Sequence, residues 1–161
     1  MTAARREYFL FIVGLLLLAA TGAAVYYISH ETNRARDVAE VRTLLTNFGQ
    51  YEKSISLSGS GGFETLRRDI QQTYAPFVTE AILQQWRIDP RSAPRRLTSS
   101  PWPDRIEVDN VSPQGAGYVV SGRIMLMTNA GPAGEIPVVA QIVRENGEWQ
   151  IAVYQEQNAS R

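Results

Sequence analysis

The chain has 161 residues, with 16 basic and 16 acidic side chains, one histidine and no cysteine. Because the charges balance, no global field favours nucleic acid, and the missing cysteines exclude disulfides, thiolate metal sites, a cysteine nucleophile and a lipidated lipoprotein. His30 is the only histidine, so zinc and other transition metals lack their usual ligands, and we expect neither a metal site nor a cofactor.

The first predicted element is an uncharged stretch over residues 8–28. A helix of about 20 apolar residues crosses the hydrocarbon core of a bilayer, so this stretch predicts a transmembrane signal anchor in contact with lipid. Tyr8 at one end and Tyr26 and Tyr27 at the other are expected at the membrane interfaces. Residues 1–7 form a short arginine-bearing tail that we expect to stay in the cytoplasm, so the C-terminal domain lies outside the cytoplasmic (inner) membrane of a single-pass bacterial envelope protein.

A cleaved signal peptide is the rival interpretation of this stretch. Gly22, Ala23 and Ala24 are small residues of the kind that a signal peptidase accepts. The apolar run continues past them to Ile28, however, and it is longer than the roughly 7–15 residues that a signal peptide needs. The sequence therefore favours an uncleaved anchor.

A stalk and first amphipathic helix are predicted over residues 29–57, with the helix itself at about 33–56. Val41, Leu45 and Phe48 recur at helical spacing and predict one buried face. Because the pattern begins so soon after the anchor, we expect the helix to continue from the membrane span.

A Gly/Ser break at residues 58–62 separates this helix from the remainder of the domain, residues 63–157. A second helical pattern over 63–86 is interrupted at Pro76, which has no backbone N–H to donate. Residues 158–161 are expected to fray.

After a proline-rich loop over 89–105, the apolar period changes from helical to two, which predicts strands. The predicted strands cover residues 105–111, 118–128, 136–144 and 148–154. Asn146-Gly147 is a type I′ turn signal between the last two, and Gly122 indicates a bulge or a close backbone approach. Two to three helices followed by a curved antiparallel sheet of about four strands define an α+β fold.

This arrangement resembles the NTF2-like (cystatin-like, cone-shaped α+β) superfamily, in a membrane-anchored, extracytoplasmic bacterial form. The resemblance rests on the helical elements at 33–56 and 63–86 and on a meander whose last hairpin reads VVAQIVRENGEWQIAVY. The segment ENGEWQI is similar to the strand-turn-strand ending common in small extracytoplasmic members. A short tail, one span and such a domain also resemble the bitopic assembly proteins of secretion and conjugation machines, which is an analogy of architecture alone.

The segment from Trp86 to Arg105 combines an excess of arginine with a tryptophan held between two prolines. A rigid tryptophan flanked by arginines is typical of binding hot spots. The predicted recognition residues are Arg91, Arg95, Arg96, Trp102, Asp104 and Arg105. The alternative is structural: Trp102 would plug the open end of the sheet, with Asp104 and Arg105 pinning the loop.

The sequence predicts no catalytic residues. Asp104, Glu107 and Asp109 lie near one another, but their spacing fits a solvated strand face, whereas an acid–base pair needs burial and a pocket. No Gly-x-Ser-x-Gly elbow, Walker loop or EF-hand loop occurs.

We therefore predict a non-catalytic, membrane-anchored interaction or scaffold module that binds a protein partner or a second copy of itself, and no nucleic acid. The alternative is a small-ligand-binding or enzymatic NTF2-like domain that uses its cone cavity; a buried carboxylate with room beside it would favour this alternative. A filling of the cone by Trp86, Trp149, Met125 and Met127 would argue against it. A third hypothesis is a regulatory partner of a membrane enzyme, with contacts made mainly by the transmembrane helix.

Overall fold

A computed structural model describes residues 31–55, 62–94 and 100–157 of the chain. The predicted cytoplasmic tail, the anchor with its interfacial tyrosines and the fraying C-terminal tail lie outside these residues. None of the helices within the described ranges is both long and apolar enough to cross a membrane.

The chain divides into two compact units, Met1–Val38 and Ala39–Arg161. Residues 31–38 of the first unit are helical. The second unit holds the α+β domain, and the description below concerns this unit.

The second unit begins with a helix over residues 39–51, which tightens into a single 3₁₀ turn, η1 (Glu52–Ser54). Val41, Leu45 and Phe48 are fully buried, as their helical spacing predicted. The α-helix ends at residue 51 and not at the predicted residue 56, so it is about one turn shorter than the sequence predicted.

Two further helices, α2 (Gly62–Tyr74) and α3 (Glu80–Ile88), are joined by a turn over residues 75–77. Pro76 lies in this turn, which confirms the break predicted there. A second 3₁₀ turn, η2 (Pro90–Ser92), follows α3.

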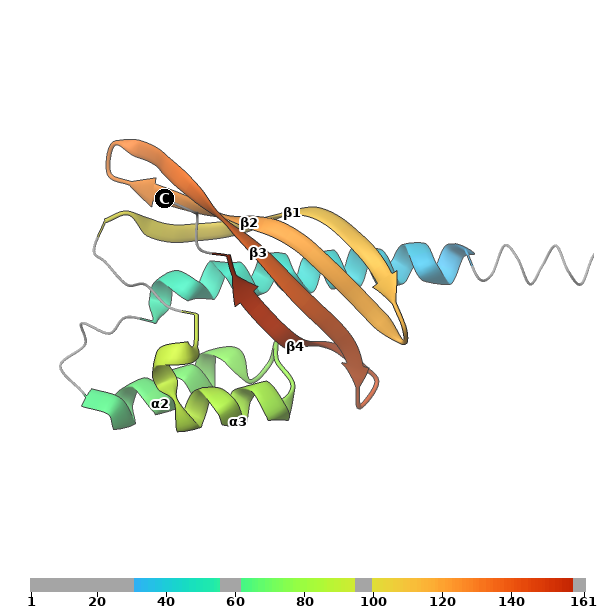
Figure 1. The fold of residues 1–161 in the computed structure, drawn as a ribbon, viewed down its shortest axis with the longest axis horizontal. Coiled ribbons are helices and arrows are strands. Elements are labelled where there is room, and N and C mark those ends of the chain that lie inside the picture. Colours follow the sequence, from blue (N-terminus) through green and yellow to red (C-terminus); the bar gives the residue numbers. More distant parts are fainter. Residues whose placement is uncertain (1–30, 56–61, 95–99, 158–161) are drawn as a thin grey trace, which may run out of the picture. The chain divides into compact units, whose positions relative to one another are not determined.

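Four antiparallel strands complete the domain in the spatial order β1-β2-β3-β4, a simple meander (Figure 1). The strands are β1 (Trp102–Gln114), β2 (Gly117–Thr128), β3 (Gly131–Glu145) and β4 (Glu148–Glu156). Asn146 and Gly147 join β3 to β4 with positive φ angles of 53° and 87°, as the predicted type I′ turn requires. The predicted α+β order of helices followed by a four-stranded sheet is confirmed.

The loop predicted over 89–105 is wrong at both ends, because η2 and the beginning of β1 occupy them. β1 begins at Trp102, which pairs with Met127 of β2. The prolines on either side of Trp102 indicated a loop, but β1 is an edge strand, where proline is tolerated. The strand absorbs the irregularity by a register shift between Pro103 and Arg105.

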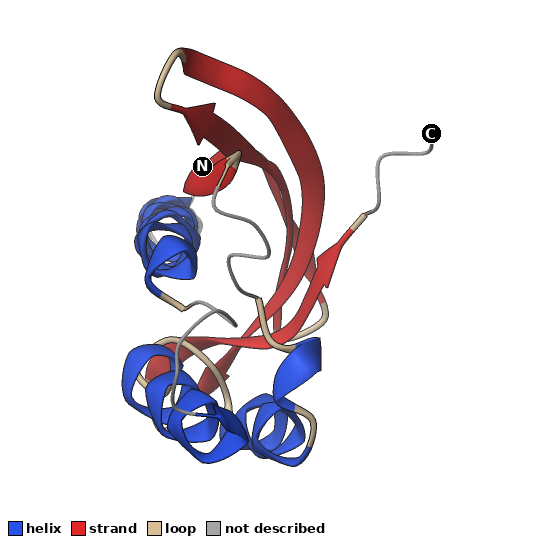
Figure 2. Ribbon diagram, turned by 90° about the vertical axis from the view of Figure 1, so that its left-hand side faces the viewer, coloured by secondary structure: helices blue, strands red, loops and turns tan. Residues whose placement is uncertain are grey.

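The sheet curves around the helices, which lie on its concave side (Figure 2). Two glycines allow close approaches in this arrangement. A Cβ on Gly49 would lie 2.5 Å from Cγ1 of Ile106, so the first helix contacts β1 only because residue 49 has no side chain. A Cβ on Gly122 would lie 2.6 Å from the carbonyl oxygen of Glu107, which confirms the predicted close backbone approach.

The turn between α2 and α3 is tied to the sheet by backbone hydrogen bonds. The amide of Thr79 donates to the carbonyl oxygen of Ile151 at 3.0 Å, and the amide of Ile151 donates to Phe77 at 2.9 Å. These bonds hold the two helices beside β4.

Candidate functional site

Aromatic rings fill the space between the helices and the concave face of the sheet. The ring centroid of Phe48 lies 4.9 Å from that of Tyr74, 5.0 Å from that of Tyr154 and 6.4 Å from that of Trp86. Phe48, Tyr74 and Trp86 are buried, and tilted or edge-to-face contacts of this kind add to the stability that burial provides. This part of the interior is packed by side chains of the first helix, α2, α3 and β4.

The residues whose packing inside the cone would argue against catalysis have different positions. Trp86 lies in the aromatic cluster, and Trp149 packs edge-to-face on Tyr118 at 5.3 Å. Met125 alternates with the buried Ile124 on β2, so it points to the opposite face of the sheet.

A buried carboxyl group lies beside this cluster. Glu52, in η1, is 1% exposed, and the hydroxyl of Tyr154 donates a hydrogen bond to its Oε1. Burial raises the pKa of Glu52 to about 8, with a smaller contribution from the charge of Glu156, while the hydrogen bond from Tyr154 opposes the rise. The Glu52 carboxyl is therefore protonated at neutral pH.

Sequence reasoning missed Glu52, although a signal was present. Glu52 follows Phe48 by four positions and Leu45 by seven, so it continues the buried stripe of the first helix. A buried carboxyl can be predicted from the sequence where an acidic residue occupies a position in an otherwise apolar helical stripe.

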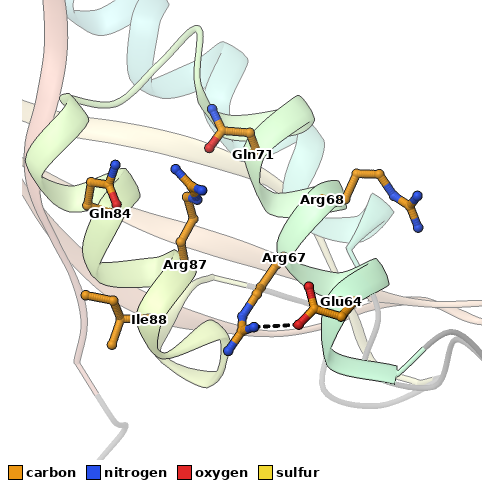
Figure 3. Close-up of a pocket in the computed structure, with 7 residues that line it drawn as sticks. All are labelled: Glu64, Arg67, Arg68, Gln71, Gln84, Arg87 and Ile88. Atoms are coloured by element: carbon orange, nitrogen blue, oxygen red, sulfur yellow. Dashed lines mark hydrogen bonds and ion pairs between the residues drawn. The ribbon is translucent and has the colours of Figure 1, made fainter.

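A groove of about 670 Å³ lies between α2 and α3 on the outer surface of the helices (Figure 3). Three arginines and one glutamate give it a positive charge, and two glutamines and one isoleucine complete its lining. The lining residues are Glu64, Arg67, Arg68, Gln71, Gln84, Arg87 and Ile88.

The groove contains polar atoms that have no partner. Glu64 holds Nη1 of Arg67 at 2.6 Å, but Nε of Arg67 and Oε1 of Gln71 are buried and lack a hydrogen-bond partner among the described residues. Arg87 is exposed and forms no ion pair with any carboxylate that the structure describes. Figure 3 shows the Arg87 side chain extending between Gln71 and Gln84. Of these groups, the exposed guanidinium of Arg87 is available to an external ligand.

The groove was not predicted from the sequence, and its signal is weak. On α2, Arg67 and Gln71 are four residues apart and lie beside the buried positions Leu66 and Ile70. Periodicity shows which helix positions are polar, but it does not show which second helix will face them.

The predicted recognition residues lie in several elements. Arg91, in η2, has its guanidinium 5.2 Å above the ring of Phe63. Trp102 is half-buried at the beginning of β1, and Arg95 and Arg96 lie outside the described residues.

Asp104 and Arg105 are brought together on β1. Nη1 of Arg105 lies 2.9 Å from Asp104, and Nη2 of Arg105 lies 2.6 Å from Glu107. Lys53 lies 3.7 Å from Asp104. These pairs lie at the surface, where ion pairs contribute little to stability.

Within the described ranges, no group of three or more histidine, cysteine, aspartate or glutamate side chains could hold a metal ion. The sequence matches no protein-family model and no curated protein.

Two solved structures are similar to this chain. One is a protein of unknown function with a cystatin-like fold from Nostoc punctiforme, which is 16% identical, with 78% of this chain and 94% of that protein covered and a TM-score of 0.45. The other is the protein Rd1NTF2_05 with five substitutions, which is 11% identical, with 79% of this chain and 99% of that protein covered and a TM-score of 0.38. The order of helices followed by a four-stranded meander is given by the chain's own structure.

Proposed function

We propose that this chain is a single-pass, membrane-anchored, extracytoplasmic interaction module without catalytic activity. The observation that supports this proposal is the arginine-bearing groove between α2 and α3, whose exposed charges suit reversible contact with another protein. The apolar stretch at residues 8–28 supports the membrane anchor.

A second candidate is ligand binding or acid–base chemistry on the concave side of the sheet, because a carboxyl with a strongly raised pKa is characteristic of such sites. Glu52 fits a structural role better. Its carboxyl is 1% exposed, it accepts a hydrogen bond from Tyr154, and aromatic rings pack beside it.

Site-directed photocrosslinking of the full chain in its native membranes tests the proposal. A photoreactive amino acid replaces Gln84, which lines the groove, or Gln141, an exposed residue of β3 that serves as the control. We expect a specific protein adduct from position 84 and none from position 141. Absence of any specific adduct from the whole surface of the domain would overturn the proposal.

The segment at the beginning of β1 remains a second candidate contact. Trp102 is half-buried, which fits both a structural plug and a binding residue with one exposed edge. If the segment is a binding surface, Trp102→Ala will reduce recovery of the crosslinked partner while leaving the unfolding midpoint nearly unchanged. A lowered midpoint with normal partner recovery would assign it to the structural role.

The contribution of the anchor is separable from that of the domain. Replacement of residues 8–28 by an unrelated membrane span should preserve the adduct at position 84. Loss of the adduct would instead favour the hypothesis that the transmembrane helix makes the main contacts.

A further inference from the structure

We infer that the groove between α2 and α3 recognises an acidic segment of a partner protein in which a carboxylate side chain lies next to an aliphatic one. This inference rests on the proposed interaction function and names the chemistry of the partner.

The positive charge of the groove favours an anionic ligand. Arg87 has no carboxylate partner among the described residues, and Arg67 uses only part of its guanidinium on Glu64. An exposed guanidinium forms paired hydrogen bonds with carboxylates, and each is stronger than a bond between neutral groups.

The remaining groups favour a peptide over a simple anion. Gln84 is an exposed lining residue whose amide nitrogen donates to Oε1 of Glu80 at 2.7 Å, so its amide oxygen is the atom that can accept a hydrogen bond from a ligand. A fully ionised anion carries only acceptors, whereas a peptide brings backbone N–H donors together with carboxylate acceptors. A peptide can therefore bind both Gln84 and the arginines.

Ile88 adds an apolar contact at the end of α3. It is 78% exposed, the highest value among the exposed large apolar side chains that the structure describes. An aliphatic side chain next to the carboxylate would cover it, which a phosphate or a lipid headgroup would not. A lone exposed isoleucine is common, but this one lines the same groove as Arg87.

The geometry also provides a matched control. Arg34 is exposed like Arg87 and forms no ion pair with any carboxylate that the structure describes, but it does not line the groove. Charge reversal at Arg34 or at Arg87 changes the net charge by the same amount. If binding depends on a site-specific contact, only the Arg87 variant will bind more weakly. If binding depends on long-range attraction, the two variants will lose binding equally.

The test is selection of random displayed peptides on the full chain in nanodiscs of uncharged phosphatidylcholine. We expect the enriched peptides to carry aspartate or glutamate beside leucine, isoleucine or valine, and to bind roughly ten-fold or more weakly to Arg87→Glu than to wild type. Arg34→Glu should retain binding within about two- to three-fold. Displacement of the peptide by inorganic phosphate alone, or equal loss in the two variants, would overturn the inference.

Two further outcomes separate this inference from the proposed function. If position 84 yields a partner adduct but the enriched peptides lack acidic residues, the interaction function stands and the acidic-segment inference is wrong. If phosphatidylglycerol vesicles bind wild type and not Arg87→Glu while no peptide is enriched, the groove recognises lipid headgroups and the inference is again wrong.

Discussion

Polar side chains have opposite environments in the interior around Glu52 and in the groove between α2 and α3. In the interior, burial raises the pKa of Glu52 to about 8, and Tyr154 supplies its hydrogen bond. In the groove, Arg87 is exposed, and polar atoms of Arg67 and Gln71 have no partner among the described residues.

This difference indicates what each region does. A neutral, hydrogen-bonded carboxyl among aromatic rings is a structural component of the core, because its polar needs are met within the domain. Charged groups on an accessible surface, such as the guanidinium of Arg87, can bind an external ligand. Substitutions in the interior should therefore change stability and leave partner binding intact. Substitutions in the groove should lower partner binding and leave stability nearly unchanged.

The largest expected effect on stability is in the interior. Phe48→Ala removes the ring at the centre of the aromatic cluster and should lower the free energy of unfolding by about 3–5 kcal/mol. The measurement is urea unfolding of the full chain in detergent, followed by tryptophan fluorescence. Tyr51→Ala, at a ring that is 45% exposed, is the control and should cost clearly less. Equal costs would show that the cluster is not the core.

The second prediction concerns pH. Because the folded pKa of Glu52 is about 8 and the reference value is 4.5, the folded state keeps the proton while the unfolded state releases it between these values. The contribution of Glu52 to stability is complete below about pH 4.5 and is lost as the pH rises to about 8, at up to about 1.4 kcal/mol per pH unit.

Glu52→Gln isolates this effect, since the amide stays neutral and can still accept from Tyr154. We expect the variant to be more stable than wild type at pH 7 by about 1–3 kcal/mol and to show a flatter pH dependence between about pH 5 and 8. Parallel stability curves for the two proteins would mean that Glu52 is ionised in the folded state.

A smaller loss is expected from Tyr154→Phe. This change keeps the ring but removes the hydroxyl that donates to Glu52, so the buried carboxyl loses its hydrogen bond. The free energy of unfolding should fall by about 1–2 kcal/mol at pH 7. Combination with Glu52→Ala, which removes the acceptor, gives a double-mutant cycle, and a coupling energy near zero would contradict the pairing.

The smallest effect on stability is expected in the groove. Arg87→Glu changes an exposed residue that has no ion pair in the described part of the chain, so the free energy of unfolding should change by about 0.5 kcal/mol or less. The same variant should lose most partner binding. Thermal unfolding and partner recovery, measured on one preparation, separate the two properties, and a strongly destabilised variant would assign Arg87 to the fold.

Much of the fold was predictable because it depends on local patterns. The buried stripe of Val41, Leu45 and Phe48 and the Asn146-Gly147 turn are readable from residue spacing and turn chemistry. The beginning of β1 was missed, because the prolines around Trp102 favour a loop unless the strand is known to lie at an edge.

The two sites were harder to predict, for different physical reasons. Glu52 was missed because a carboxylate is normally solvated, and only its tertiary partner Tyr154, far away in sequence, makes burial tolerable. The groove was missed because it requires α2 to face α3, and neither helix carries that information in its own period. Of the predicted recognition residues, the structure joins Asp104 and Arg105 by an ion pair and places Arg91 on Phe63.

The most direct test of the central claim, that the groove and not the interior contacts the partner, is photocrosslinking at position 84 in native membranes in two backgrounds. The account predicts that Arg87→Glu abolishes the adduct and that Glu52→Gln leaves it at the wild-type level. An adduct that survives Arg87→Glu and disappears with Glu52→Gln would contradict the account and identify the interior as the functional site.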